Sequence, residues 1–230
     1  SEHSTYIPKD YLFDKQCYSY FGWNNISKVR YNGQETVTFM RTEQSAVEIK
    51  KYNQGRDFQY SINAYRHPEG ATLVDADYYK DANGNEALLV IAFKDAVSTV
   101  VCIDTSATTT PCKHLKTMKS DFQFCDQSKM HFLTGNRKLV VSSGNRVAAL
   151  AFHVKKQAGF TVWPSRLNIA WQVEGQVNGK ALDVRGITSL DNDHIYLADG
   201  KNCRVLELNG AGQCQRTVLN AEEHFLRHVY

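Results

Sequence analysis

Leu88-Leu89-Val90-Ile91-Ala92-Phe93 is followed by a short polar turn at 94–96 and then by Thr99-Val100-Val101-Cys102-Ile103. Two runs of apolar and β-branched residues on either side of a short polar turn predict a β-hairpin. The same pattern recurs at 37–49, 139–152 and 194–208. The four turns are centred near residues 43, 95, 145 and 201, so the hairpins recur at intervals of 52, 50 and 56 residues.

Further strand-like runs lie between these hairpins, at 57–62, 71–74 and 167–173. Each repeat can therefore supply about four strands, which is the content of one blade of a β-propeller. A blade cannot bury both of its faces alone, and stacking against neighbouring blades buries them. We predict an all-β fold, a small β-propeller of four or five blades, that forms a single domain over residues 1–230.

The segment before the first hairpin, residues 1–34, is rich in aromatic residues. Many propellers close their ring by pairing an N-terminal strand with the last blade, because closure protects the edge strands. We expect part of this segment to pair with the chain near 216–219. The alternative is an N-terminal arm that packs over one face.

The composition excludes several classes of protein. The 230 residues are 42% hydrophobic and 22% charged, which is too apolar for a disordered chain. The net charge of +3 is small for a nucleic-acid binder, and the longest apolar run, 87–93, has the length of a strand and not of a membrane span. The densest basic stretch is interpreted as a solvated surface, with a polyanion site as the alternative: Lys113, Lys116, Lys119 and Lys129.

The cysteines are even in number, and none has the spacing of a zinc site: Cys17, Cys102, Cys112, Cys125, Cys203 and Cys214. Two pairs flank turn-like segments at similar short separations, as residues facing each other across antiparallel strands would. We therefore predict the disulfides Cys102–Cys112 and Cys203–Cys214, and Cys17–Cys125 follows by elimination. The alternative is six free thiols in a cytosolic protein.

Disulfides indicate an oxidising compartment, so we predict a secreted, extracellular protein. Asn25-Ile26-Ser27 is an N-glycosylation sequon, which predicts a glycan on Asn25 and agrees with secretion. The sequence opens with Ser1-Glu2-His3 and no signal-peptide apolar region. This is consistent with a mature protein whose leader has been removed, and equally with a recombinant chain.

One unit carries a resemblance to a known family. Its matching elements are a Gly-Ile pair, a strand that ends in Tyr-Leu-Ala-Asp, and Asn-x-Arg-Val after the turn, all within residues 186–208. This unit resembles an NHL repeat and is similar to blades of gluconolactonase-type propellers. The resemblance implies a six-bladed propeller, whereas this chain has the length for four or five blades, or for an irregular or truncated six-bladed relative.

In lactonase-type propellers, carboxylate and amide side chains from different blades bind a divalent metal at the axis. By this resemblance Asp199 is a candidate metal ligand, although in NHL repeats the corresponding Asp belongs to the turn. The acidic stretch around Asp75 and Asp77 is a second candidate, for calcium, but it lacks the spacing of an EF-hand. Its continuation at 81–85 is better explained as a hairpin turn, because Asn-Gly favours positive φ. We therefore predict no cofactor, with calcium or another divalent metal as the alternative.

The sequence contains no nucleophile elbow, P-loop or dinucleotide-binding glycine motif. Trp163 and Trp23 are candidate ligand-binding residues, because a loop tryptophan can stack on a sugar or a partner side chain. We predict a monomeric, secreted binding protein that holds an extracellular protein or a glycan on its loops or in its axial funnel. The alternatives are a metal-dependent lactonase or esterase-type hydrolase and a secreted host-interaction factor.

Overall fold

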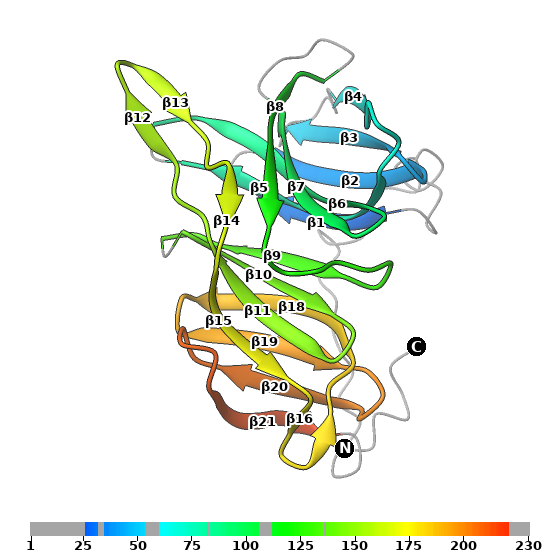
Figure 1. Cartoon of the computed structure of the whole chain (residues 1–230), viewed down its shortest axis with the longest axis vertical. Coiled ribbons are helices and arrows are strands. Elements are labelled where there is room, and N and C mark those ends of the chain that lie inside the picture. Colours follow the sequence, from blue (N-terminus) through cyan, green and yellow to red (C-terminus); the bar gives the residue numbers. More distant parts are fainter. Residues whose placement is uncertain are drawn as a thin grey trace, which may run out of the picture.

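The computed structural model describes residues 26–31, 35–53, 60–81, 83–105, 112–135 and 137–220. All regular structure in these residues is β-strand, and the strands form a four-blade, propeller-like arrangement (Figure 1). No helix in the described part of the chain has the length and hydropathy to cross a membrane.

Each of the four blades is an antiparallel, four-stranded meander. Blade 1 contains β1 (Ile26–Tyr31), β2 (Glu35–Glu43), β3 (Ala46–Asn53) and β4 (Tyr60–Arg66). Blade 2 contains β5 (Thr72–Lys80), β6 (Glu86–Lys94), β7 (Val97–Asp104) and β8 (His114–Ser120). Blade 3 contains β9 (Lys129–Leu133), β10 (Lys138–Ser143), β11 (Arg146–Ala151) and β15 (Ile169–Glu174). Blade 4 contains β18 (Val184–Asp191), β19 (His194–Asp199), β20 (Arg204–Leu208) and β21 (Cys214–Asn220).

Blade 3 is interrupted between its third and fourth strands. The chain leaves β11, forms a hairpin of β12 (Lys155–Gln157) and β13 (Phe160–Val162), and then adds β14 (Arg166–Leu167) to the outer edge of blade 2. β14 pairs with β8 in parallel, whereas the strands within each blade are antiparallel. A second small hairpin, β16 (Gln176–Val177) and β17 (Lys180–Ala181), connects blade 3 to blade 4.

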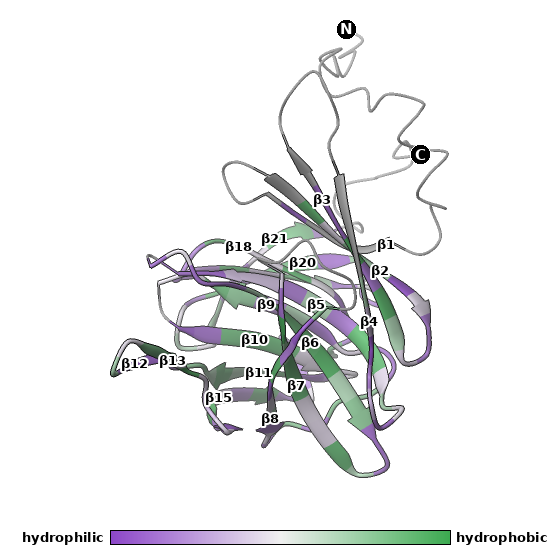
Figure 2. Ribbon diagram, turned by 90° about the horizontal axis from the view of Figure 1, so that it is seen from above, coloured by the Kyte–Doolittle hydropathy of each residue, from purple (hydrophilic) through white to green (hydrophobic). Residues whose placement is uncertain are grey.

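The four hairpins predicted from the sequence are the two middle strands of the four blades: β2–β3, β6–β7, β10–β11 and β19–β20. In blades 2 and 3 these strands are covered on both faces, so they contain continuous runs of buried apolar residues. In β6, for example, the run 87–92 is buried without interruption, and Figure 2 shows this strand as largely hydrophobic. The predicted N-terminal closing strand lies outside the described residues, apart from 26–31, which form the first strand of blade 1.

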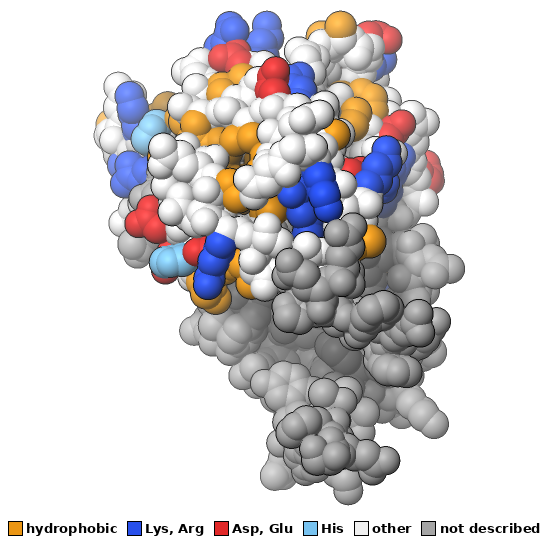
Figure 3. Space-filling model, turned by 90° about the horizontal axis from the view of Figure 1, so that it is seen from below, with side chains coloured by type: hydrophobic (Ala, Val, Ile, Leu, Met, Phe, Trp, Pro, Cys, Tyr) orange, Lys and Arg blue, Asp and Glu red, His pale blue; other side chains and the backbone are white. Residues whose placement is uncertain are grey.

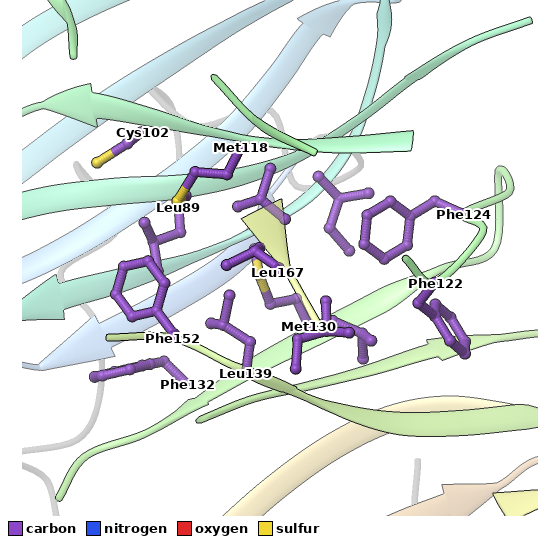
Figure 4. Close-up of a cluster of buried hydrophobic side chains, with 14 of the residues drawn as sticks. Leu89, Cys102, Met118, Phe122, Phe124, Met130, Phe132, Leu139, Phe152 and Leu167 are labelled. Carbon is purple, nitrogen blue, oxygen red and sulfur yellow. The ribbon is translucent and has the colours of Figure 1, made fainter. Parts of the chain in front are cut away.

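Three hydrophobic clusters fill the spaces between successive blades. In blades 2 and 3, the alternation of side chains along a strand divides each middle strand between two clusters. In β6, Leu88 and Val90 face blade 1, whereas Leu89 and Ile91 face blade 3. Figure 4 shows the largest cluster. In it, Leu89 and Met118 of blade 2 pack against Leu139 of blade 3 and against Phe152, which directly follows β11.

The two turn-flanking disulfide predictions are wrong, and the free thiols show why. Cys102 points into the cluster between blades 2 and 3, whereas Cys112 lies with Val101 and Ile103 on the opposite face of the same sheet. Cys203 precedes β20, and Cys214 pairs with Leu208 at the far end of that strand. Five residues of strand extend about 16 Å, which no disulfide can span. Cys125 is also a free thiol, and its predicted partner Cys17 lies outside the described residues.

We expect thiol alkylation of the native protein to follow this burial. Cys203 is exposed and should react with iodoacetamide first. Cys102 and Cys112 should react only after unfolding, because burial raises the pKa of both thiols, that of Cys112 to about 11. Peptide mass spectrometry over a time course measures the order. A disulfide-linked peptide that joins Cys102 to Cys112 would contradict the structure.

Candidate functional site

The first strands of the four blades lie beside one another in chain order, with β5 in contact with β1 and β9, and β9 in contact with β18. One polar side chain from each strand takes part in a single chain of contacts. Arg30 Nε lies 2.8 Å from Asp77 Oδ1, and Asp77 Oδ2 lies 3.7 Å from His131 Nδ1. The other ring nitrogen of His131, Nε2, lies 2.7 Å from Ser189 Oγ. This axial polar chain, Arg30–Asp77–His131–Ser189, links all four blades.

The pairing of Asp75 and Asp77 with β9 follows from strand geometry. β9 is an edge strand, so the N–H groups that point away from β10 need acceptors outside their own sheet. The N–H of Met130 donates to Asp75 Oδ2 at 2.9 Å, and the N–H of Phe132 donates to Asp77 Oδ2 at 2.6 Å. Donors and acceptors both recur at every second residue, so two strands that run side by side bring both pairs into register.

This arrangement explains what the candidate metal ligands of blade 2 do. Both carboxylates are buried, and Asp77 accepts the N–H of Tyr78 at 2.8 Å in addition to its contacts with Arg30 and Phe132. Within the described ranges, no group of three or more His, Cys, Asp or Glu side chains is placed to hold a metal ion. The 81–85 segment is the expected hairpin turn: Asp81 accepts the N–H groups of Asn83 and Asn85, and Gly84 has a φ of 79°.

Asp199, the candidate ligand from the NHL-like unit, lies in a structural network. Its carboxylate accepts the N–H of Asp183 at 3.0 Å, the side-chain amide of Asn202 at 2.9 Å and Nε of Arg204 at 2.8 Å. Arg204 in turn donates to the carbonyl of Val177 at 2.9 Å. The network therefore holds the β16–β17 hairpin against the turn between β19 and β20.

Of the candidate tryptophans, Trp163 is half-buried and not free to stack on a ligand with its whole ring. Its ring centroid lies 5.5 Å from that of Tyr79 and 6.2 Å from that of Phe152, in an aromatic group that closes the cluster between blades 2 and 3. Burial, together with the nearby Asp81 carboxylate, raises the pKa of Tyr79 to about 12. Trp23 and the predicted glycosylation site Asn25 lie outside the described residues.

The β12–β13 hairpin projects from the body of the molecule (Figure 1). Its Phe160 is 75% exposed and its Val162 is 40% exposed, so two apolar side chains face solvent on adjacent positions of one strand face. Trp163 and Val154, which flank the hairpin, pack against the core cluster and anchor its base. This hairpin was not predicted from the sequence, although its Ala-Gly turn between two short runs is a usable signal. The contacts of Arg30 and His131 with Asp77 were not predicted either, because no local sequence pattern indicates them.

Histidines form a second polar group where blade 1 meets blade 2. Tyr65 Oη lies 3.0 Å from Nδ1 of His114, whose Nε2 lies 3.0 Å from Thr117 Oγ1. Nearby, Nδ1 of His67 accepts the N–H groups of Glu69 and Ala71. Burial lowers the pKa of both His67 and His114, so both imidazoles favour the neutral form in the folded protein.

The charged side chains on one face of the described residues are of both signs. Lys113 and Lys119 of the basic stretch are exposed, whereas Lys116 and Lys129 are half-buried. On the face seen in Figure 3, from below the view of Figure 1, hydrophobic side chains lie among Lys, Arg, Asp and Glu side chains. The mixture of signs on this face agrees with the small net charge of +3.

No family model matches the chain, and no curated protein matches it. Among solved structures, it is similar to a protein of unknown function from Bacteroides caccae, with 12% identity, a TM-score of 0.41, and coverage of 86% of this chain and 82% of that one. It is also similar to a functionally unknown protein from Desulfotomaculum acetoxidans, with 10% identity, a TM-score of 0.45, and coverage of 84% and 71%. The four-blade arrangement is compatible with a propeller-repeat family, and the NHL-like resemblance rests on its motif residues alone.

We expect Asp77→Ala to lower the free energy of unfolding by about 3–5 kcal/mol, because it leaves the Arg30 charge and the Phe132 N–H without their shared acceptor. Urea denaturation measures the loss. The exposed Asp126 provides a matched control, and Asp126→Ala should change stability by less than about 0.5 kcal/mol. Equal stabilities of the two variants would show that the axial polar chain does not hold the blades together.

The histidines at the boundary of blades 1 and 2 predict a loss of stability on acidification. In the unfolded chain, His67 and His114 gain protons near their ordinary pKa of 6.5, whereas in the folded protein they resist protonation until lower pH. Stability should therefore fall as the pH drops from 7.5 to 5.5. His194 acts in the opposite sense, because its hydrogen bond to Asp191 raises its pKa.

Melting temperatures at the two pH values test this assignment. The double variant His67→Gln/His114→Gln should show a smaller decrease than the wild type, and His194→Gln should show a slightly larger one. An unchanged decrease in the double variant would assign the pH dependence to other groups.

Proposed function

We propose that the chain is a binding protein that holds a protein partner on a loop projecting from its blades. The observation that carries this proposal is the β12–β13 hairpin, which interrupts blade 3 and presents the exposed Phe160. A propeller blade needs only its four strands, so the insertion adds nothing to the stacking of the blades. Apolar side chains held out into solvent on an anchored hairpin are instead typical of an interaction site.

The axial polar chain supports the choice of a loop over the axial funnel. Its members contact one another, and Asp75 and Asp77 accept backbone N–H groups of β9. The polar side chains that could bind a ligand at the axis are therefore already in contact with other groups of the protein. An extracellular location is part of the proposal and now rests on the sequon at Asn25, because the two turn-flanking disulfides that favoured it are not formed.

Parallel screens for binding and turnover test the proposed function. We expect the purified chain to select one or more folded proteins from a display library of extracellular domains, and to give no signal on a glycan array. Binding to glycans alone would favour a lectin-like role. Empty binding screens, together with chelator-sensitive hydrolysis of lactones or esters, would favour the metal-dependent hydrolase instead.

A further inference from the structure

The register of the β12–β13 hairpin sorts its side chains onto two faces. Gln157 pairs with Phe160 and Lys155 pairs with Val162, so these four side chains share one face. Lys156 pairs with Thr161 on the other face. Phe160 and Val162 are exposed, whereas Thr161 on the second face is half-buried. The face with Phe160 and Val162 is therefore the one turned away from the body.

The hairpin is built to hold this face in place. Ala158 and Gly159 form its turn with φ values of 49° and 81°, the left-handed pair that matches the twist of a two-residue hairpin loop. Beyond β13, the chain is fixed by Trp163 in the aromatic group and by the carbonyl of Ser165, which accepts the N–H of Lys119 at 2.9 Å. A hairpin whose backbone is held in this way loses little conformational freedom on binding, and the small entropy loss favours affinity.

Charge on the same face indicates the chemistry of the partner. Lys155 is exposed, lies across from Val162, and forms no ion pair with any side chain in the described ranges. A recess that accepts Phe160 and Val162 would place its rim beside this ammonium group. A carboxylate on that rim would complete the interface by charge complementarity.

We propose that Phe160 and Val162 insert into an apolar recess on a folded protein partner, and that carboxylates on the rim of the recess pair with Lys155. This inference rests on the proposed function, whose partner and binding element it specifies. Aromatic side chains seated in pockets dominate the affinity of many protein interfaces.

Two other occupants fit these observations less well. An extended peptide added as a third strand would find only three residues on either strand of the hairpin, which is shorter than most paired strands. A membrane surface would gain from one aromatic side chain and two lysines, and stable membrane attachment generally needs stronger or additional signals. The lysines would also need anionic lipid, which is concentrated in the cytoplasmic leaflet.

The first experiment places a photo-crosslinking amino acid, p-benzoylphenylalanine, at position 160 of the full chain. Leu190 provides the matched control, because it is another exposed apolar side chain, 80% exposed, on β18 of blade 4. We expect irradiation in a native extract of the source organism to yield a protein adduct from position 160 and none of the same mass from position 190.

The second experiment measures the affinity of the crosslinked protein, made recombinantly, for variants of the chain by calorimetry. Phe160→Ser should weaken binding by about 30-fold or more, and Leu190→Ser should leave the affinity within about twofold. Lys155→Glu should weaken binding, and added salt should weaken the wild-type complex more than the Lys155→Gln complex. Both apolar side chains are exposed, so neither serine variant removes core packing.

The outcomes separate this inference from the proposed function. A partner that binds Phe160→Ser as tightly as the wild type would overturn the hairpin assignment and leave standing only the proposal that the chain binds a protein. Phe160-dependent flotation with phosphatidylserine-containing vesicles, absent with phosphatidylcholine alone and without a protein adduct, would assign the hairpin to a membrane and overturn the inference. The absence of any partner in the crosslinking and display experiments would overturn both.

Discussion

Blade 2 meets blade 3 through hydrogen bonds from an edge strand to two carboxylates. The N–H groups of Met130 and Phe132 point away from their own sheet, and Asp75 and Asp77 accept them from the neighbouring blade. Buried backbone groups without partners are costly, so this contact fixes which strand lies beside β9 and in which register. Asp77 then draws Arg30 of blade 1 to the same place, and His131 extends the contact to Ser189 of blade 4.

The contacts among the first strands of the blades limit where a binding site can lie. Side chains that could bind a ligand at the axis are already in contact with one another, and the NHL-like network of Asp199, Asn202 and Arg204 fastens a turn. The chain departs from a plain meander where it leaves blade 3, forms the β12–β13 hairpin and returns along blade 2 as β14. Structural requirements are weakest there, because the exposed hairpin adds no strand to a blade.

Much of the fold could be predicted from the sequence, and the reason is burial. The middle strands of blades 2 and 3 are covered on both faces, so β6 contains the apolar run 87–93 and β10 the run 139–141, which are visible without an alignment. Outer strands such as β15 and β21 are partly exposed and give a weaker signal. The two turn-flanking disulfide predictions failed although their spacing was suitable. Cys102 and Cys112 lie on opposite faces of one sheet, and Cys203 and Cys214 lie at opposite ends of a strand.

Local sequence alone determined the four hairpins and the Asn-Gly turn at 81–85, because these depend on residues within a few positions of one another. Only the tertiary structure decided the role of Asp75 and Asp77, which the sequence presents as an acidic stretch suited to calcium. Their acceptors meet donors 55 residues away, and the distance between such groups depends on how whole blades stack. The exposure of Phe160 was likewise settled by packing, because a phenylalanine beside a turn has the same local sequence whether a neighbouring element covers it or solvent does.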